Sequence, residues 1–207
     1  MATIHPRPDD HGKPVSITSP STPSPVATWN SATSVATVTP NGPMPSELNG
    51  IAVAGQTTPT TPVGWEALAT GATFTEPPFT PPKHKRPAAG VVIEESDGRI
   101  WLVAPSNAHG GYQATFPKGT VDPGASLHAT AIREAFEEAG LNVELTGFFA
   151  DSDRTLSFTR YYLARRTGGS PAKMGWESQA VHLVPRAKLA EFLTNPNDKP
   201  FIKLLEA

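Results

Sequence analysis

The chain has 207 residues, with 17 basic and 19 acidic side chains and a net charge of −2, so it has no general positive excess for binding a polyanion. The absence of cysteine excludes disulfides, thiolate metal sites and cysteine nucleophiles. No apolar run approaches the ~18 residues of a membrane-spanning helix. The N-terminus also has no basic region followed by an apolar stretch, so we expect no membrane association and a cytoplasmic location.

The N-terminal extension, residues 1–82, is rich in proline, serine and threonine. It holds 15 of the 23 prolines and only two basic residues. Such a composition buries too little apolar surface to offset chain ordering, which favours an extended or disordered segment. The alternative is an arm that lies along the domain, or along a partner subunit in a homodimer. Its plausible anchors are Trp29, residues 48–53 and Trp65.

Residues 83–207 have the composition and length of one globular domain, which begins with a short basic run at 83–86. The first half of this domain is predicted, in chain order, to contain a buried strand at 88–93, a hairpin turn at Asp97–Gly98, a strand at 99–104, a loop at 107–111 and a strand at 112–116. The predicted strands lead directly into the loop Phe116-Pro117-Lys118-Gly119.

A helix is predicted after this loop, and more strands follow it. Downstream we predict strands at 143–150 and 157–164, a loop at 165–179, a strand at 180–184, a helix at 186–193 and a short helix at 201–206. Taken alone, this order of elements indicates only the α+β class.

The predicted helix between Ser126 and Gly140 has one apolar side and one acidic side. Ser126 is a suitable N-cap, and Gly140 stands where a left-handed C-terminal cap is expected. The apolar stripe consists of small and aliphatic side chains at i+4 spacing: Leu127, Ala131, Ala135 and Ala139. We expect this stripe to face a sheet and to leave the acidic side over a cleft.

Glu134, Glu137 and Glu138 stand at i, i+3 and i+4, so a helix directs all three to the acidic side. Like charges at this spacing destabilise a helix by roughly 0.2–0.5 kcal/mol per pair. A cation would offset this cost, and Mg²⁺ commonly binds through one or two carboxylates together with substrate phosphates. The helix therefore points to a divalent cation site.

The segment from Gly119 to Leu141 resembles the Nudix box, G-x5-E-x7-R-E-U-x-E-E-x-G-U, in which U is a bulky apolar residue. The matching positions are Gly119, Arg133, Glu134, Glu137, Glu138, Gly140 and Leu141. The chain departs from the pattern at two positions, where Ala125 replaces the first glutamate and the small Ala135 replaces the first U residue. The resemblance implies the α/β/α sandwich of that family, with a mixed central sheet.

Nudix enzymes cleave a diphosphate that is linked to another moiety, and the resemblance implies this reaction here. By position, the three box glutamates and a backbone carbonyl near Lys118 and Gly119 would hold Mg²⁺ or Mn²⁺, and Arg133 would orient the glutamates. The proton acceptor would be a box glutamate or a glutamate of a later loop, for which Glu177 is the candidate. With Ala125 in place of glutamate, Arg133 needs another partner, for which Asp122 and Asp151 are candidates.

The expected substrate is a small phosphoanhydride, with a dinucleoside polyphosphate preferred. Phe116–Gly119 resembles the corresponding loop of dinucleoside polyphosphate hydrolases and decapping enzymes, and Lys118 would contact the polyphosphate. We also count Arg160 and Tyr162 as candidate substrate contacts. A basic set could instead favour an inositol pyrophosphate: Arg154, Arg160, Arg165, Arg166 and Lys173. Nucleic acid is not expected except as a capped RNA end, and a non-catalytic nucleotide-binding protein is the remaining alternative.

Overall fold

A computed structural model describes residues 3–55, 57–106 and 111–206. Its central sheet contains β3 (Ala36–Val38), β6 (Arg86–Glu94), β7 (Ile100–Pro105), β8 (Lys118–Thr120), β9 (Leu141–Asp153), β10 (Ser157–Gly169) and β11 (Ser178–Val184). The order is β3-β11-β7-β6-β10-β9, with β8 paired to β6. The sheet is mixed, because β6 and β10 run parallel whereas the other neighbours run antiparallel.

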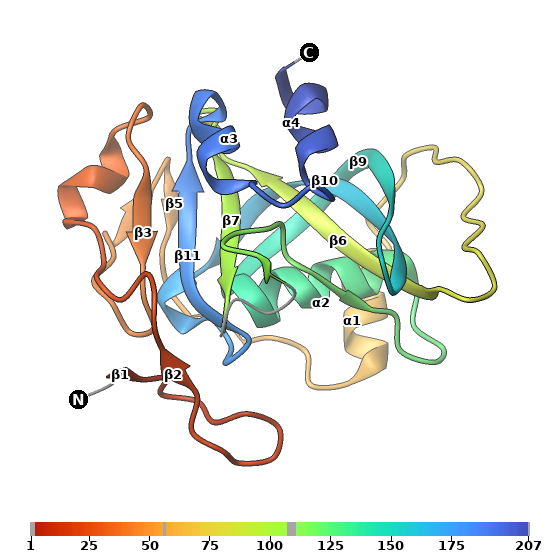
Figure 1. Cartoon of the computed structure of the whole chain (residues 1–207), viewed down its shortest axis with the longest axis horizontal. Coiled ribbons are helices and arrows are strands. Elements are labelled where there is room, and N and C mark those ends of the chain that lie inside the picture. The colour runs from red at the N-terminus through yellow and green to blue at the C-terminus, as the bar shows by residue number, and fades with distance from the viewer. Residues whose placement is uncertain (1–2, 56, 107–110, 207) are drawn as a thin grey trace.

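Helices cover both faces of this sheet (Figure 1). The helices of the domain are α2 (Leu127–Ala139), α3 (Leu189–Phe192) and α4 (Lys199–Glu206), with single 3-10 turns at η3 (Pro171–Lys173) and η4 (Arg186–Lys188). Successive residues of β6 alternate between the faces: Val91 and Ile93 share a core with α2, and Val92 shares one with α3 and α4. This arrangement confirms the predicted α+β class and the α/β/α sandwich.

The small residues of α2 allow the helix to lie close to the sheet. Ala131, Ala135 and Ala139 are fully buried, as the predicted stripe requires. Ser126 caps the helix by accepting a hydrogen bond from the Ala129 amide at 3.1 Å. Gly140 ends it in the left-handed conformation, with φ of 67°. Both predicted ends of the helix are confirmed.

Two predicted elements differ from the structure. Residues 112–116 do not form a strand, and only Thr115 makes an isolated bridge to Val103; the paired strand is β8, at 118–120. Gly90 permits this pairing, since a Cβ there would overlap the Pro117 carbonyl and Lys118. The predicted loop at 165–179 begins later, because β10 stays paired with β9 as far as Gly169. Residues 107–110 of the other predicted loop lie outside the described residues.

The N-terminal extension packs on the domain. Its elements are β1 (Thr3–Ile4), β2 (Ser16–Ile17), η1 (Val26–Asn30), the edge strand β3, β4 (Glu47–Leu48), β5 (Ile51–Ala52) and α1 (Pro62–Ala69). Trp29 is fully buried and stacks on Trp101 with ring centroids 5.8 Å apart. Leu48 is buried in the same core. Of the two predicted alternatives, the structure therefore has the arm that lies along the domain, and a homodimer through this arm stays a prediction.

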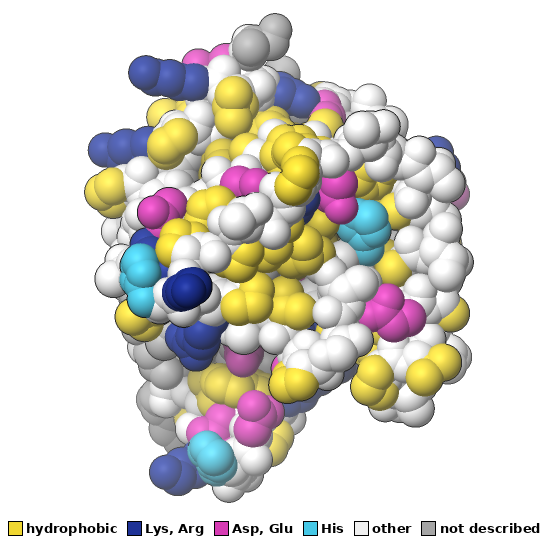
Figure 2. All heavy atoms as spheres, turned by 90° about the vertical axis from the view of Figure 1, so that its right-hand side faces the viewer, with side chains coloured by type: hydrophobic (Ala, Val, Ile, Leu, Met, Phe, Trp, Pro, Cys, Tyr) yellow, Lys and Arg dark blue, Asp and Glu magenta, His cyan; other side chains and the backbone are white. Residues whose placement is uncertain are grey.

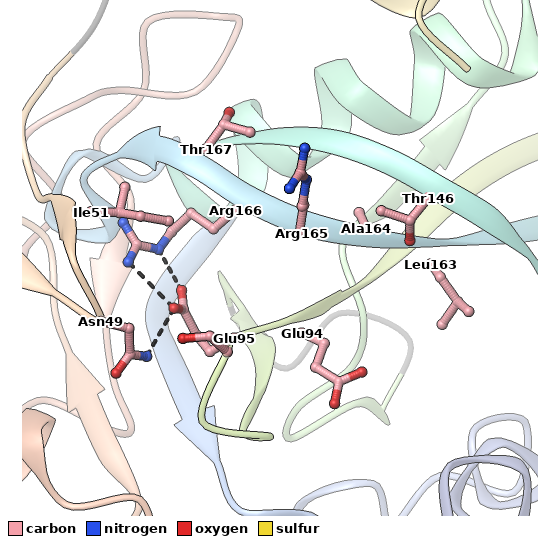
Figure 3. A pocket seen from close by; sticks show the side chains of 11 residues that line it. Asn49, Ile51, Glu94, Glu95, Thr146, Leu163, Ala164, Arg165, Arg166 and Thr167 are labelled. Atoms are coloured by element: carbon pink, nitrogen blue, oxygen red, sulfur yellow. Dashed lines mark hydrogen bonds and ion pairs between the residues drawn. The ribbon is translucent and has the colours of Figure 1, made fainter. Parts of the chain in front are cut away.

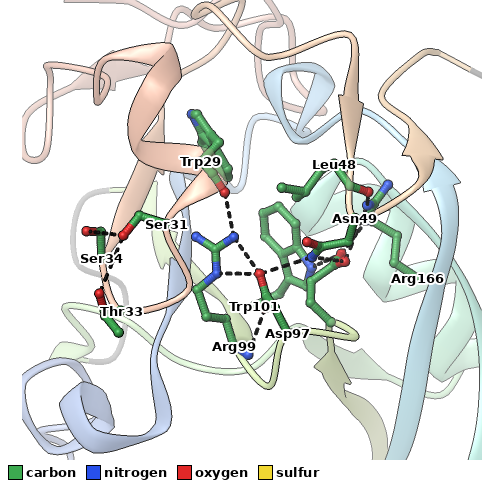
Figure 4. Close-up of polar contacts among 11 residues, drawn as sticks. Trp29, Ser31, Thr33, Ser34, Leu48, Asn49, Asp97, Arg99, Trp101 and Arg166 are labelled. Carbon is green, nitrogen blue, oxygen red and sulfur yellow. Dashed lines mark hydrogen bonds and ion pairs between the residues drawn. The ribbon is translucent and has the colours of Figure 1, made fainter.

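Figure 4 shows two of the buried guanidinium groups that tie the extension to the domain, Arg99 and Arg166. Arg99 Nη2 donates to the Trp29 carbonyl at 2.6 Å, and Arg166 Nη2 donates to the Leu48 carbonyl at 2.8 Å. The charge of Arg99 is matched by Asp97, and that of Arg166 by the buried Glu95. Because a buried charge without its partners is costly, these contacts make the extension part of the folded domain.

The segment between α1 and β6 covers a further side of the molecule. Trp65 of α1 packs on Phe136 of α2 at 6.0 Å, and Phe74 packs on Tyr162 at 5.8 Å. Figure 2 shows this side, on which hydrophobic side chains gather near the middle with acidic side chains beside them. Within the described part of the chain, no helix is long and apolar enough to cross a bilayer.

Candidate active site

The acidic side of α2 lies against β8. Glu138 Oε2 accepts a hydrogen bond from the Lys118 amide at 2.8 Å. A Cβ on Gly119 would overlap the Glu134 carboxylate, so only glycine lets β8 approach this side chain. The spacing between the loop glycine and the helix glutamates is thus explained by direct contact between them.

A third carboxylate joins these two from another part of the chain. Carboxylate oxygens of Glu134, Glu138 and Glu177 all lie within 4.8 Å of one another. Glu177 is exposed and precedes β11, and its carbonyl accepts a hydrogen bond from the Ser106 amide at 2.7 Å. The three side chains line a cavity of about 570 Å³ together with Glu137 and Lys118. The predicted candidates Glu177 and Lys118 therefore share one cavity with the box glutamates.

The electrostatics of this cluster favour a bound cation. Burial, followed by the charges of nearby glutamates, raises the pKa of Glu138 to about 7. Burial and the charge of Glu138 raise the pKa of Glu134 well above its ordinary range. Ionised oxygens crowded in this way suit a hard divalent cation such as Mg²⁺ or Mn²⁺. The residues present therefore fit a metal site, and Glu134, Glu138 and Glu177 are its protein ligand candidates.

Glu137 has a different environment from the other two box glutamates. Its Oε2 lies 2.5 Å from Arg133 Nη1, and about half of its side chain is exposed at the rim of the cavity. Arg133 also contacts Glu134 at 2.9 Å and Asp122 at 3.5 Å. Arg133 thus pairs with two of the box glutamates, and its orienting role stays a prediction.

The replacement of glutamate by Ala125 leaves Arg133 with partners from its own helix and from the loop before it. Of the two predicted substitutes, Asp122 is within reach, whereas Asp151 is not the partner. Asp151 instead makes a two-pronged ion pair with Arg160, with both N–O distances 2.8 Å. The prediction failed for Asp151 because the β9–β10 pairing directs it to a cation on its neighbouring strand.

Arg160 and Tyr162 were predicted as substrate contacts, and the structure places both away from the cavity. Arg160 is buried, with its guanidinium 4.9 Å from the ring centroids of Phe79 and Phe148. Tyr162 is fully buried in the α2-side core, 4.7 Å from the His128 ring. Both residues act as structural members of β10, because that strand is covered on both faces.

The predicted basic set does not gather around the carboxylates in the described structure. Arg154 pairs with the buried Asp198, Arg165 pairs with Glu144 at the surface, and the Lys173 ammonium contacts the Asn41 side chain. Arg165 and Arg166 line a separate cavity beside the β4–β5 hairpin (Figure 3). In that cavity Arg166 forms an ion pair with Glu95, so its positive charge is already matched within the protein.

Several residues of the cavity wall were not predicted from the sequence. Tyr112, Trp176 and Ser106 line it. Tyr112 comes from the predicted strand at 112–116 and Trp176 from the predicted loop at 165–179, whereas Ser106 lies between two predicted elements. The adjacency of Trp176 to Glu177 was the available signal. Glu66 was also missed: its carboxylate accepts hydrogen bonds from the Ser126 amide and hydroxyl at 2.7 and 2.8 Å, which caps α2 from the extension.

Comparison with known proteins identifies the family of this chain. The family model described as NUDIX domain matches residues 84–205. An RNA pyrophosphohydrolase of Caulobacter vibrioides is 37% identical over 100 residues, which cover 47% of this chain and 54% of that protein. An RNA pyrophosphohydrolase of Pectobacterium carotovorum is 28% identical over 115 residues, which cover 55% and 58%. The chain therefore spans a little over half the length of these curated relatives.

A solved structure also has the same fold. A NUDIX hydrolase from Nitrosomonas europaea aligns with a TM-score of 0.50 and 18% identity, over 60% of this chain and 72% of that one. The region matched by the family model begins within the basic run at 83–86, so the whole N-terminal extension, residues 1–82, lies outside it.

Proposed function

The chain belongs to the Nudix family, and from this premise we propose that it is a metal-dependent pyrophosphohydrolase. The observation that carries the proposal is the group formed by Glu134, Glu138 and Glu177, whose oxygens lie within 4.8 Å of one another in an open cavity. Oxygen ligands in this number, from a helix and a separate loop, suit Mg²⁺ or Mn²⁺.

Each cavity residue has a separate task in this proposal. A bound divalent cation would screen the phosphate charge and lower the pKa of a water molecule. Glu134 and Glu138 hold the cation, Arg133 keeps Glu134 and Glu137 in place, and Lys118 contacts a phosphate oxygen through its ammonium group. The proton of the attacking water passes to a carboxylate oxygen, either of Glu177 or of a box glutamate.

We infer that the substrate is a nucleoside polyphosphate, with a dinucleoside polyphosphate first. Lys118 and the carboxylate group line the same cavity, which supports a ligand that carries several phosphates. An RNA 5′ end is the second candidate, because the curated relatives are RNA pyrophosphohydrolases. An inositol pyrophosphate loses its support, since the arginines that favoured it are engaged elsewhere.

A substrate panel tests the proposal. The full chain with Mg²⁺ is incubated with diadenosine tetraphosphate, 5′-triphosphate RNA, capped RNA, ADP-ribose, NADH, nucleoside triphosphates and an inositol pyrophosphate, and the products are identified. We expect cleavage of a phosphoanhydride in a nucleotide and a loss of at least about 100-fold in kcat for Glu138→Gln. Glu47→Gln, which removes an exposed carboxylate on β4, is the matched control and should retain full activity.

Two outcomes would contradict the proposal. Nucleotide binding without turnover of any compound would indicate a non-catalytic binding protein, and unchanged activity of Glu138→Gln would remove the carboxylate mechanism. Hydrolysis of the inositol compound alone would overturn the substrate class while leaving the metal site intact.

A further inference from the structure

The loop that carries Glu177 also places an aromatic ring at the cavity. Trp176 lines the cavity with the carboxylates. Its backbone is firmly held, because its carbonyl accepts a hydrogen bond from Ser106 Oγ at 2.6 Å. One residue earlier, the Gly175 amide donates to the Glu137 carbonyl at 2.7 Å, and a Cβ on Gly175 would overlap that carbonyl. The loop is therefore anchored both to the residue that follows β7 and to the end of α2.

The N-terminal extension fixes the indole ring itself. Trp176 Nε1 donates to Asp10 Oδ1 at 3.0 Å, and Asp10 lies in the turn between β1 and β2. The turn is built by Asp9, whose Oδ1 accepts from the His11 and Lys13 amides at 2.9 and 2.8 Å. This hairpin lies outside the region that matches the family.

A second contact holds the hairpin beside the cavity. Gln179 Oε1, on β11, accepts a hydrogen bond from the Thr18 amide at 2.8 Å, and Gln179 Nε2 donates to the Pro105 carbonyl at 3.0 Å. The extension thus contacts the chain on either side of Glu177, at Trp176 and at Gln179. Movement of the ring away from the cavity would break its hydrogen bond to Asp10 unless the hairpin moved with it.

Tyr112 adds a second ring to the same cavity. Its hydroxyl accepts from Arg154 Nη1 at 2.7 Å and from Asn197 Nδ2 at 2.9 Å, so the ring position is defined by both donors. The Lys118 ammonium lies 5.4 Å from its ring centroid, within the range of a cation–π contact. The cavity therefore combines carboxylates, the cations Lys118 and Arg133, and two aromatic rings whose polar atoms are hydrogen-bonded.

We propose that Trp176, positioned by Asp10 of the extension, is the platform on which the planar base of the substrate stacks. This inference rests on the proposed function and adds the group that lies beyond the phosphoanhydride. Stacking of a base on an aromatic side chain is tolerant of base identity, because every base has a π-face. The extension thereby contributes to substrate selection through a residue that holds the platform without touching the reacting atoms.

Kinetics with and without a base test the platform. For diadenosine tetraphosphate, Trp176→Ala is expected to raise KM by about 10- to 100-fold and to leave kcat within about threefold. The inhibition constant of inorganic tripolyphosphate, which has no base, should stay unchanged. Trp176→Phe should recover most of the loss, and Asp10→Ala, which removes the acceptor of the indole N–H, should raise KM a few-fold. Trp65→Phe, on α1, is the control for loss of an indole elsewhere.

Binding of a methylene-bridged diadenosine tetraphosphate analogue, measured by calorimetry with Mg²⁺, separates this inference from the proposed function. If the parent protein binds the analogue but hydrolyses no nucleotide, the enzymatic proposal is contradicted. If, in that case, the Trp176→Ala variant binds the analogue at least tenfold more weakly than the parent, the stacking platform is still supported. Equal binding by the two proteins, or equal losses for the nucleotide and for tripolyphosphate, would overturn the platform. Thermal melts confirm that each variant is folded.

Discussion

The carboxylate of Glu138, when ionised, is unfavourable for folding but well suited to binding a divalent cation. Its pKa is raised to about 7 by burial, so the folded state resists its ionisation. The stabilising contribution of this group is therefore fully present below its ordinary pKa of 4.5 and is lost as the pH rises through 7. The contribution of Glu138 to the free energy of unfolding therefore falls by about 3 kcal/mol between low and high pH. A divalent cation binds the ionised form and would recover this loss.

We therefore predict that Mg²⁺ raises the melting temperature more at pH 8 than at pH 5.5. Protons compete with the cation for the same oxygens at the lower pH, so the gain there should be small. Differential scanning fluorimetry of the parent and Glu138→Gln measures the effect, and the variant should lose most of the gain at pH 8. An equal gain for both proteins at both pH values would show that the cation binds elsewhere.

At the scale of single residues, the sequence predicted the helix glutamates, Lys118 and Glu177, but not the aromatic residues Tyr112 and Trp176 that line the same cavity. The i, i+3, i+4 spacing placed the glutamates on one side of α2, but spacing alone cannot show that Glu137 turns to Arg133 while Glu177 approaches Glu134 and Glu138. Asp10 and Trp176 are 166 positions apart in the chain, and no local pattern connects residues at that distance. Arg160 was predicted to contact the substrate, but it forms an ion pair with Asp151 on the adjacent strand, and the sequence does not show which strands are neighbours.

Among the elements, α2 depends on α1 for part of its N-terminal cap. In a capping box, a glutamate at the third helical position accepts from the N-cap amide. That position holds Ala129 here, and Glu66 of α1 supplies the missing acceptor to the Ser126 amide at 2.7 Å. A carboxylate at this end also interacts favourably with the helix dipole.

We predict that Glu66→Gln lowers the free energy of unfolding by about 1 kcal/mol, through the weakened cap. Urea denaturation measures the change, with Glu47→Gln as a control that removes the same charge from an exposed strand. If the two variants were equally stable, Glu66 would not contribute to the cap.

The strands of the domain follow their apolar patterns closely, and the exception has a physical cause. The central residues of β6, β7 and β11 are buried on both faces, and these strands were predicted. Residues 112–116 have similar composition, but Gly90 opens a place on β6 that β8 occupies. The choice between these neighbouring segments depends on a contact between strands, which periodicity does not encode.

For the molecule as a whole, the extension is an integral layer of the fold. Its average composition suggested disorder, yet a few residues supply the burial that the average conceals: Trp29, Ala36, Val38 and Leu48 are all at most 1% exposed. Arg99 and Arg166 require carbonyls from the extension as well. A few buried apolar side chains, spaced among the prolines, are therefore sufficient to order the N-terminal extension.

We predict that Trp29→Ala lowers the free energy of unfolding by about 3–5 kcal/mol, because it leaves a cavity over Trp101 and loosens the extension. Val26→Ala, in the same 3-10 helix but 40% exposed, should change it by less than about 0.5 kcal/mol. Chemical denaturation compares the two. Similar small changes would mean that the extension does not stabilise the domain.

Binding of Mn²⁺ to the full chain, followed by electron paramagnetic resonance, tests most directly whether the carboxylate group holds a divalent cation. The parent and Glu47→Gln should both reduce the signal of free Mn²⁺ to the same extent, whereas Glu134→Gln and Glu138→Gln should bind at least about tenfold more weakly. Undiminished Mn²⁺ binding by the Glu134→Gln and Glu138→Gln variants, each verified as folded, would contradict the account.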